Sequence, residues 1–338
     1  MSVPAPLNWF GSKSRLAPKI VEHFPPHRTY AEPFGGSAAV LFAKQPSKIE
    51  IYNDIDGELV NFFRVLRDAD FCAKLHHAAE RTPYARAEFE LAKESSNDPV
   101  ESARRFLVRH RMSFGGNGQD WCYSVATSRR GTAAAVRRWR WGVESLPIIH
   151  ERLKNVQIEC ADWRGVLSRF DGSDTLFFLD PPYHPETRVS GLYRYELTHD
   201  DHRELIAYLL AVRGMVVLSG YSHETYSVLE RAGWARIDYP TCTHVSGSLI
   251  RRVESLWLSP SIARKGETRT LFLSPTERMR RGAHHAHKVM VAATAKKLLR
   301  AVERLRAEGE KPTATRLARV TRMSREHLTR KYRHLFAS

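Results

Sequence analysis

The sequence has few cysteines and no long hydrophobic run. Its four cysteines, Cys72, Cys122, Cys160 and Cys242, are far apart and show neither the spacing of a disulfide framework nor that of a zinc site, which predicts reduced thiols. No apolar stretch approaches the ~18 residues that a membrane span requires, and the first residues lack the basic start and apolar core of a secretory signal. We therefore expect a protein without a membrane helix that stays in the cytoplasm.

Acidic residues are also in the minority, and the excess of basic ones is unevenly distributed. The net charge is +16. Residues 276–338 carry 17 Lys/Arg against 5 Asp/Glu, and residues 101–155 carry 11 against 4, which leaves a net charge of −3 on the rest of the chain. Segregated positive charge is typical of surfaces that neutralise phosphates. The sequence therefore predicts two surfaces that bind nucleic acid.

Short segments rich in β-branched and aromatic residues alternate with helical patterns. Residues 176–179 are continuously apolar, as expected of a parallel strand that helices cover on both faces. Apolar residues recur every three or four positions over Gly57–Arg67 and Asp200–Arg213, which predicts amphipathic helices. The pattern predicts a doubly wound, mainly parallel α/β sheet. Its expected strands are Thr29–Phe34, Ile49–Asn53, Val156–Cys160, Thr175–Asp180, Met215–Gly220, Trp234–Tyr239 and Ser255–Ser259.

The gap between the second and third strands is too long for a simple crossover, so we interpret residues 65–155 as an inserted, mainly helical subdomain. Its second half interleaves arginines with aromatic residues, a combination that suits phosphate contacts and the reading of base edges. The alternative is a solvated basic helix whose aromatic residues form a small core. The candidate DNA-binding residues of the insert are Arg109, Arg111, Asn117, Arg129, Arg130, Arg137 and Arg138.

After Pro260 the strand pattern ends and a polar linker follows. It contains His284-His285-Ala286-His287. Because these histidines have no cysteine or carboxylate neighbours, we predict no metal site.

The last part of the chain predicts a helix-turn-helix. Thr313 and Ser324 can each cap a short helix, with a turn between the two. The second helix carries Arg325 and Arg330, which are able to reach base edges or phosphates. The alternative is a helical bundle for dimerisation, so a monomer and a homodimer both stay open.

The tetrapeptide Asp180-Pro181-Pro182-Tyr183 directly follows an apolar strand, so it belongs at the carboxyl edge of the sheet, where α/β proteins place their sites. The exocyclic amine of a base is a poor nucleophile because its lone pair is delocalised into the ring. The Asp180 carboxylate and the Pro181 carbonyl can accept hydrogen bonds from such an amine, and Tyr183 can stack on an extruded base. The tetrapeptide therefore indicates methyl transfer to an exocyclic amino group.

A second motif predicts a nucleoside cofactor at the same edge. The first strand leads into Glu32-Pro33-Phe34-Gly35-Gly36-Ser37, whose glycines permit close backbone approach. Asp54 closes the second strand about twenty residues later and can bind ribose hydroxyls. The alternative is that the glycines only make a tight turn and Asp54 only caps the next helix. The order of strand, glycine turn and strand-end acid favours the cofactor.

With these motifs, residues 7–260 resemble the Dam-type, α-class family of DNA adenine-N6 methyltransferases, which includes bacteriophage members. The segment Asn8-Trp9-Phe10-Gly11-Ser12-Lys13 is similar to the family's N-terminal motif, which implies that Trp9 and Lys13 line a pocket for S-adenosyl-L-methionine. By the same resemblance, Glu32 and Phe34 lie at the methionine and adenine ends of that pocket.

The resemblance extends to three further parts of the chain. It implies that Asp54 binds the cofactor ribose and that Asp162 and Trp163 lie beside the cofactor adenine. It also places the target-recognition subdomain in the basic insert. Two positions depart from the family: Ala38 stands where many members have glycine, and Trp163 replaces the usual phenylalanine. The C-terminal module lies outside the resemblance.

We therefore predict a Rossmann-like, seven-stranded methyltransferase domain formed by residues 1–64 and 156–275, a target-recognition insert at 65–155 and a basic helical DNA-binding module at 276–338. The predicted activity is methylation of N6 of a flipped adenine in double-stranded DNA.

Three alternatives stay open. In cytosine-N4 methylation a serine often replaces the first residue of the tetrapeptide, so Asp180 favours adenine. An RNA methyltransferase fits a helix-turn-helix less well. A catalytically silent DNA-binding regulator is disfavoured by the intact Lys13, Asp54 and Tyr183.

Overall fold

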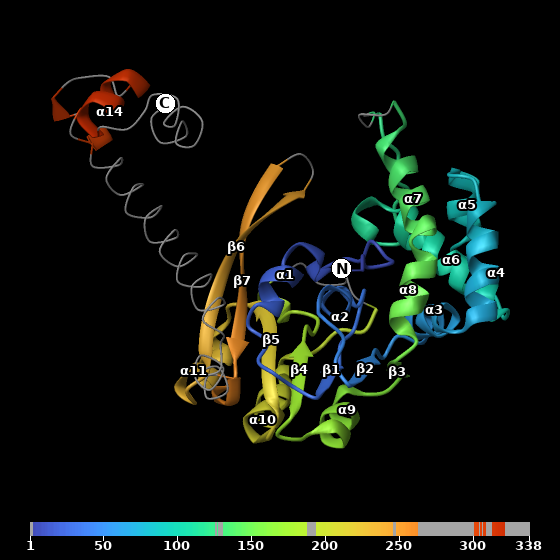
Figure 1. Cartoon of the computed structure of the whole chain (residues 1–338), viewed down its shortest axis with the longest axis horizontal. Helices are drawn as coiled ribbons and strands as arrows, with labels where there is room; N and C mark the ends of the chain where they lie inside the picture. Colours follow the sequence, from blue (N-terminus) through green and yellow to red (C-terminus); the bar gives the residue numbers. More distant parts are fainter. Residues whose placement is uncertain are drawn as a thin grey trace, which may run out of the picture. The chain divides into compact units, whose positions relative to one another are not determined.

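The computed structural model describes residues 3–125, 127, 131–187, 194–245, 248–262, 301–303, 305, 307–308 and 313–321. The chain divides into two units, Met1–Glu267 and Thr268–Ser338 (Figure 1).

The first unit is built on a seven-stranded sheet of order β3-β2-β1-β4-β5-β7-β6. Strands β1 to β5 are parallel, and β7 is antiparallel to both β5 and β6. The predicted mainly parallel α/β sheet is confirmed. The strands are β1 (Thr29–Glu32), β2 (Ile49–Asn53), β3 (Val156–Glu159), β4 (Thr175–Leu179), β5 (Met215–Tyr221), β6 (Ala235–Val245) and β7 (Ser248–Leu258).

The largest difference from the expected strands is the length of the β6–β7 hairpin. We predicted Trp234–Tyr239 and Ser255–Ser259, but the two strands pair as far as Val245 and Ser248. Pro240 interrupts the strand pattern because it cannot donate a ladder hydrogen bond. It is tolerated because β6 lies at the edge of the sheet.

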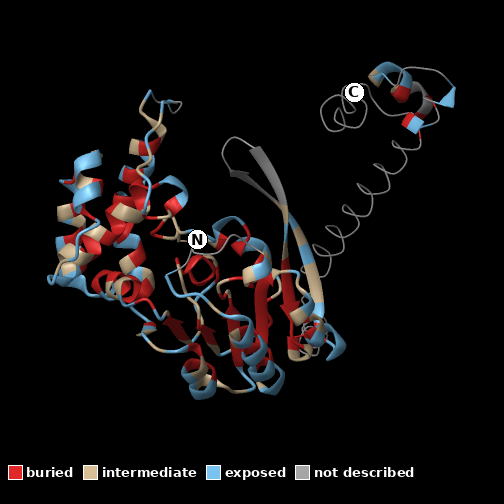
Figure 2. Ribbon diagram, turned by 180° about the vertical axis from the view of Figure 1, so that it is seen from behind, coloured by how far each residue is buried: buried red, intermediate tan, exposed pale blue. Residues whose placement is uncertain are grey.

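Helices cover both faces of the sheet, as the apolar strands predicted. Along β4, Leu176 and Phe178 join one buried cluster, and Phe177 and Leu179 join the other, because successive side chains of a strand point to opposite faces. Figure 2 shows the inner strands as buried. The first cluster includes residues of α1 (Ala17–Val21), α2 (Ala39–Ala43) and α3 (Gly57–Arg67), and the second includes residues of α9 (Trp163–Phe170), α10 (His199–Ala211) and α11 (Ser227–Arg231).

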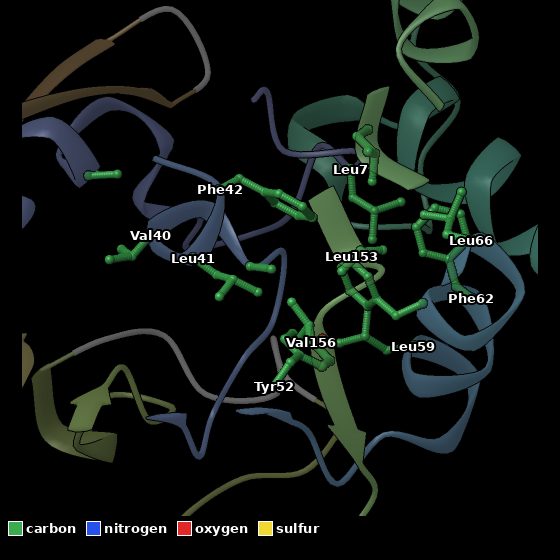
Figure 3. Close-up of a cluster of buried hydrophobic side chains, with 14 of the residues drawn as sticks. Leu7, Val40, Leu41, Phe42, Tyr52, Leu59, Phe62, Leu66, Leu153 and Val156 are labelled. Atoms are coloured by element: carbon green, nitrogen blue, oxygen red, sulfur yellow. The ribbon is translucent and has the colours of Figure 1, made fainter. Parts of the chain in front are cut away.

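The insert is mainly helical, as predicted, and its described residues share a core with the sheet. Phe62 of α3 lies 5.8 Å from Phe106 of the insert, ring centre to ring centre, and one cluster runs from the sheet into the insert (Figure 3). Each large apolar side chain buried there stabilises the fold by roughly 1.5–3 kcal/mol. The insert helices are α4 (Ala69–Glu80), α5 (Arg86–Leu91), α6 (Pro99–Met112), α7 (Ala134–Glu144) and α8 (Leu146–Leu153).

Arg67 joins the two ends of the insert. Its guanidinium donates hydrogen bonds to the carbonyls of Val156 (3.0 Å) and Lys154 (3.4 Å). The chain therefore leaves and re-enters the sheet at one place, beside β2 and β3.

In the second unit, helix α14 (Ala314–Thr321) follows Thr313, whose hydroxyl accepts the N–H of Arg316 at 3.4 Å as expected of a cap. The helix predicted to start after Ser324 lies outside the described residues, so the helix-turn-helix stays a prediction. Among the helices of the described part of the chain, none is both long and apolar enough to span a membrane.

Candidate active site

A cleft of about 1100 Å³ lies at the carboxyl edge of the sheet, where Glu32 ends β1 and Asp54 and Asp180 follow β2 and β4. The structure brings every candidate cofactor residue to this cleft, although they come from distant parts of the sequence. These lining residues are Trp9, Lys13, Glu32, Pro33, Phe34, Gly35, Gly36, Ser37, Asp54, Asp162 and Trp163. From the catalytic tetrapeptide, Asp180 and Pro182 line the cleft, and Pro181 and Tyr183 do not.

The glycine loop after β1 is held against the end of β2. A Cβ atom at Gly35 would overlap the ring of Tyr52, and Gly36 has a φ of +47°, which favours glycine. Tyr52 donates its hydroxyl to the Gly36 carbonyl (2.7 Å), and the Asp54 carboxylate accepts the Gly36 N–H (2.9 Å). Asp54 does not cap α3, because Asp56 is the cap residue. The Asp54 carboxylate also accepts the N–H of Asp56 (3.0 Å), so it connects the glycine loop to the residue before α3, and its role in cofactor binding stays a prediction.

Ala38 adopts a left-handed backbone conformation, which glycine adopts more readily than any other residue. Its φ is +55°, and its side chain is fully buried. A non-glycine residue in this conformation costs roughly 1–2 kcal/mol. Ala38 does not line the cleft, so it affects the conformation of the glycine loop and not the surface of the cleft.

Asn53 connects three strand ends, a role that its sequence motif did not reveal. Its buried side-chain amide donates to the carbonyls of Pro33 (2.8 Å) and Ala161 (2.9 Å), and its oxygen accepts the N–H of Ala161 (2.9 Å). The loops after β1, β2 and β3 are thereby fixed relative to one another.

Aromatic rings lie at two places along the cleft. Phe34 and Trp163 have ring centres 6.2 Å apart, and Trp9 lies 4.7 Å from the ring of His110 in the insert. Asp162 caps α9 by accepting the N–H of Arg164 (2.9 Å). Aromatic rings beside a carboxylate such as that of Asp162 suit a heterocyclic base, which has flat faces and a polar edge.

Burial raises the pKa of the acids in the cleft. The pKa of Glu32 is raised to about 8 by burial, although the Tyr30 hydroxyl donates to it at 2.6 Å. Burial also raises the pKa of Asp54 to about 6, against the hydrogen bonds that it accepts. Such acids favour a ligand that brings positive charge or hydroxyl donors.

Asp180 forms an ion pair with Lys13. The ammonium nitrogen of Lys13 lies 2.8 Å from Oδ1 of Asp180, donates to the carbonyl of Gly11 (3.0 Å) and lies 4.7 Å from the ring centre of Tyr183. Burial raises the pKa of Asp180 to about 6, and Lys13 opposes this rise. Asp180 is therefore mainly ionised at neutral pH.

Tyr183 is held by residues that the sequence did not identify. Its hydroxyl donates to Glu254 of β7 at 2.5 Å and lies 3.3 Å from the hydroxyl of Ser219 on β5. Tyr221 packs against its ring, with ring centres 4.6 Å apart. Glu254 and Ser219 lie in strands far along the chain, and no local motif marks them.

The arginines and asparagine assigned to DNA have different positions. Arg109 lines the cleft and pairs with Glu58, and Asn117 lines it and donates to Asp120 at 2.8 Å. Arg137 and Arg138 are exposed on α7. The remaining candidates Arg129, Arg130, Arg325 and Arg330 lie outside the described residues.

The structure overturns one of these assignments, that of Arg111. Its side chain is 4% exposed and donates to the backbone carbonyls of Pro6 (2.6 Å) and Ala5 (3.2 Å). A guanidinium enclosed in this way is not accessible to a phosphate. Arg111 therefore anchors the N-terminal segment on the insert.

Arg194 and Tyr195 also line the cleft, and no motif in the sequence marked either residue. Arg194 donates to Glu58 at 2.9 Å and lies 3.5 Å from Asp56. With Arg109 on the other side of Glu58, two arginines from different segments share one carboxylate at the cleft.

The strand order, the glycine loop and the strand-end acids define a Rossmann-like methyltransferase. Residues 9–238 match the model of the D12 class N6 adenine-specific DNA methyltransferase family, and the chain belongs to this family.

The chain is similar to several named relatives. It is 24% identical to the type II methyltransferase M.MjaIII of Methanocaldococcus jannaschii, over 61% of this chain and 78% of that protein. It is also 24% identical to a DNA adenine methylase of Vibrio cholerae, over 59% of this chain and 73% of the relative. A DNA N-6-adenine-methyltransferase of Escherichia phage P1 is 24% identical over 77% of this chain, which spans only 33% of the phage protein.

Proposed function

We propose that this protein transfers a methyl group from S-adenosyl-L-methionine to N6 of an adenine that is extruded from double-stranded DNA. The observation that carries the proposal is that Asp180 lies in the same cleft as the glycine loop and Asp54. The family match and the names of the phage and Vibrio relatives support adenine as the target.

The cleft residues fit the cofactor. Ligand pockets typically have volumes of roughly 300–1000 Å³, so a cleft of about 1100 Å³ has room for the cofactor and part of a base. Phe34 and Trp163 offer rings to its adenine, and Asp54 offers a carboxylate to its ribose. Burial raises the pKa of Glu32 to about 8, and the positive ammonium of the cofactor would favour the ionised form of this residue. When bound, S-adenosylmethionine supplies a methyl group on a positively charged sulfur, which keeps the electron pair of the broken carbon–sulfur bond.

Asp180 prepares the amino group for attack. Its ionised carboxylate accepts one N–H of the adenine amino group, and the carbonyl of Pro181 accepts the other. These two bonds draw the nitrogen lone pair out of the ring, so that it forms the new bond to the methyl carbon. After methyl transfer the nitrogen is positively charged and must lose a proton. Asp180, with a pKa of about 6, can accept this proton and pass it to water.

Lys13 must move when the base enters. Its ammonium contacts the Asp180 carboxylate and lies over the ring of Tyr183, the two places that the amino group and the base need. In the absence of the base, Lys13 balances the buried charge of Asp180. We infer that, when adenine enters, its amino group replaces the Lys13 ammonium as the hydrogen-bond donor to Asp180.

Methyl transfer from labelled S-adenosylmethionine to DNA of mixed sequence, followed by identification of the modified base, tests the proposal. We expect N6-methyladenine with the wild type. For Asp180→Ala we expect a loss of rate of about 10²–10³-fold or more, with cofactor binding retained.

Asp200→Ala is the matched control, because Asp200 is an exposed aspartate on α10 that pairs only with Arg203 among the described residues, and its activity should equal that of the wild type. No transfer by the wild type to any DNA would overturn the proposal. Methylation at cytosine N4 would overturn the choice of adenine.

A further inference from the structure

Histidines from three segments meet next to the catalytic tetrapeptide. His184 follows Tyr183, Glu186 lies in the short helix η3 (Pro185–Thr187), and His223 precedes the short helix η4 (Glu224–Tyr226). The ligand atoms of these three residues lie within 4.8 Å of one another. His199, at the start of α10, has its Nε2 atom 3.7 Å from Glu186. The cluster is therefore formed by tertiary structure and not by a local motif.

His184 is the residue of this cluster that needs an explanation. It is 1% exposed, and neither ring nitrogen has a hydrogen-bond partner among the described residues. An unsatisfied buried polar group costs roughly 1–3 kcal/mol.

A neighbouring buried histidine differs from His184 at one ring nitrogen. The Nδ1 atom of His202 of α10 lies 2.9 Å from the hydroxyl of Tyr226. Among the described residues, no hydroxyl bonds either nitrogen of His184. Its ring instead lies against the ring of His223, with ring centres 3.6 Å apart. In turn, His223 places its Nε2 atom 2.9 Å from the Glu186 carboxylate.

We propose that His184, Glu186 and His223 form a binding site for a divalent transition-metal ion of the zinc type, with His199 near enough to complete it. Imidazole nitrogens with one carboxylate are a donor set that suits Zn²⁺, whereas Mg²⁺ and Ca²⁺ prefer oxygen ligands. Metal–ligand distances of about 2.0–2.2 Å require the three side chains to rotate until their ligand atoms face one point, which includes turning the rings of His184 and His223 out of their stacked arrangement.

The ion would have a structural role. It would join the segment after the tetrapeptide to α10 and to the end of β5, and so help to hold Tyr183 in place. No step of methyl transfer depends on it. The site does not rest on the proposed function, because metal binding is measured without DNA or cofactor.

Titration of the untagged, full-length protein with Co²⁺ tests the site, because ligand-field absorption reports the coordination of this ion. His284, His285 and His287 are first replaced by alanine, since these sequence neighbours could bind metal independently. We expect one saturable equivalent of Co²⁺, displaced by Zn²⁺, and a rise in melting temperature with Zn²⁺.

In this background, His223→Gln and Glu186→Gln should each weaken Co²⁺ binding at least about tenfold and abolish the thermal shift. Both side chains are partly exposed, so both variants should fold. The matched control is Glu80→Gln, which alters a surface pair between His76 and Glu80 (3.7 Å) on α4, and it should bind like its parent. Absence of saturable binding, or unchanged affinity in both cluster variants, would overturn the proposal.

Discussion

Helices α6 and α7 lie in the same insert and are both rich in arginine, but their arginines have different surroundings. On α6, Arg104 and Arg105 pair with Glu101, and Arg111 is enclosed by backbone carbonyls. On α7, Arg137 and Arg138 are exposed to solvent.

The comparison separates two uses of one residue type. A paired or buried guanidinium has already exchanged water for protein acceptors, so its removal leaves those acceptors without a donor, and it contributes little to a phosphate contact. An exposed guanidinium keeps its charge available and can release counterions when it meets DNA. We therefore expect α7 and not the buried side of α6 to carry the electrostatic part of DNA binding.

Replacement of Arg111 should give the largest effect. In Arg111→Met, the carbonyls of Ala5 and Pro6 lose their hydrogen-bond donor. The variant also loses the contact between the guanidinium and the ring of Trp141, which lie 5.6 Å apart in the wild type. We expect the free energy of unfolding, measured with urea, to fall by about 2–4 kcal/mol.

The double variant Arg137→Met/Arg138→Met is the control. It should change the free energy of unfolding by less than about 0.5 kcal/mol but should weaken DNA binding and reduce the slope of log affinity against log salt by about 2. The comparison fails if Arg111→Met is as stable as the wild type and loses DNA affinity instead.

Removal of the C-terminal unit should give the next largest effect. Truncation after Ser274 removes residues 275–338, which carry 17 basic and 5 acidic side chains. We expect DNA affinity at low salt to fall by about ten- to a hundredfold, with a weaker salt dependence. Cofactor binding, measured by calorimetry, should not change.

Unchanged DNA affinity of the truncated protein would instead assign the tail to dimerisation, which light scattering on both proteins would detect.

Replacement of Lys13 should give the smallest effect, a shift in pH dependence. Asp180 must be ionised to accept the amino group, so kcat/KM should fall as the pH drops through about 6. Because Lys13 lowers the pKa of Asp180, Lys13→Met should move this acidic limb to higher pH. Lys19→Met, on the exposed side of α1, should leave the limb in place. An acidic limb that does not move in Lys13→Met would show that another group sets it.

The sequence predicted the cleft better than it predicted the surfaces around it. Gly35, Asp54 and Asp180 could be assigned because each follows a recognisable strand, and strand ends in a parallel sheet converge. Their assembly in one cleft agrees with this expectation, and the binding role of each residue stays a prediction.

The misassignment of Arg111 and the omission of Glu254 and His184 have physical causes. Residues two apart on a helix do not share a face, so Arg109 and Arg111 could not both point to DNA, but only the packed structure shows which one is enclosed. Glu254 and His184 acquire their partners from segments distant in sequence. Such contacts depend on tertiary packing, which no local pattern reports.

The insert shares a core with the sheet, and this limits how the insert, which we predict to recognise the target, can be exchanged. Phe106 and the apolar side of α3 pack together, and Arg67 closes the insert at its base. An insert from a relative would therefore have to bring a matching inner surface, and a simple cassette exchange should give a poorly folded protein. The predicted target-recognition role of the insert therefore points to the exposed side chains of α7 as the positions to vary, because they take no part in these contacts.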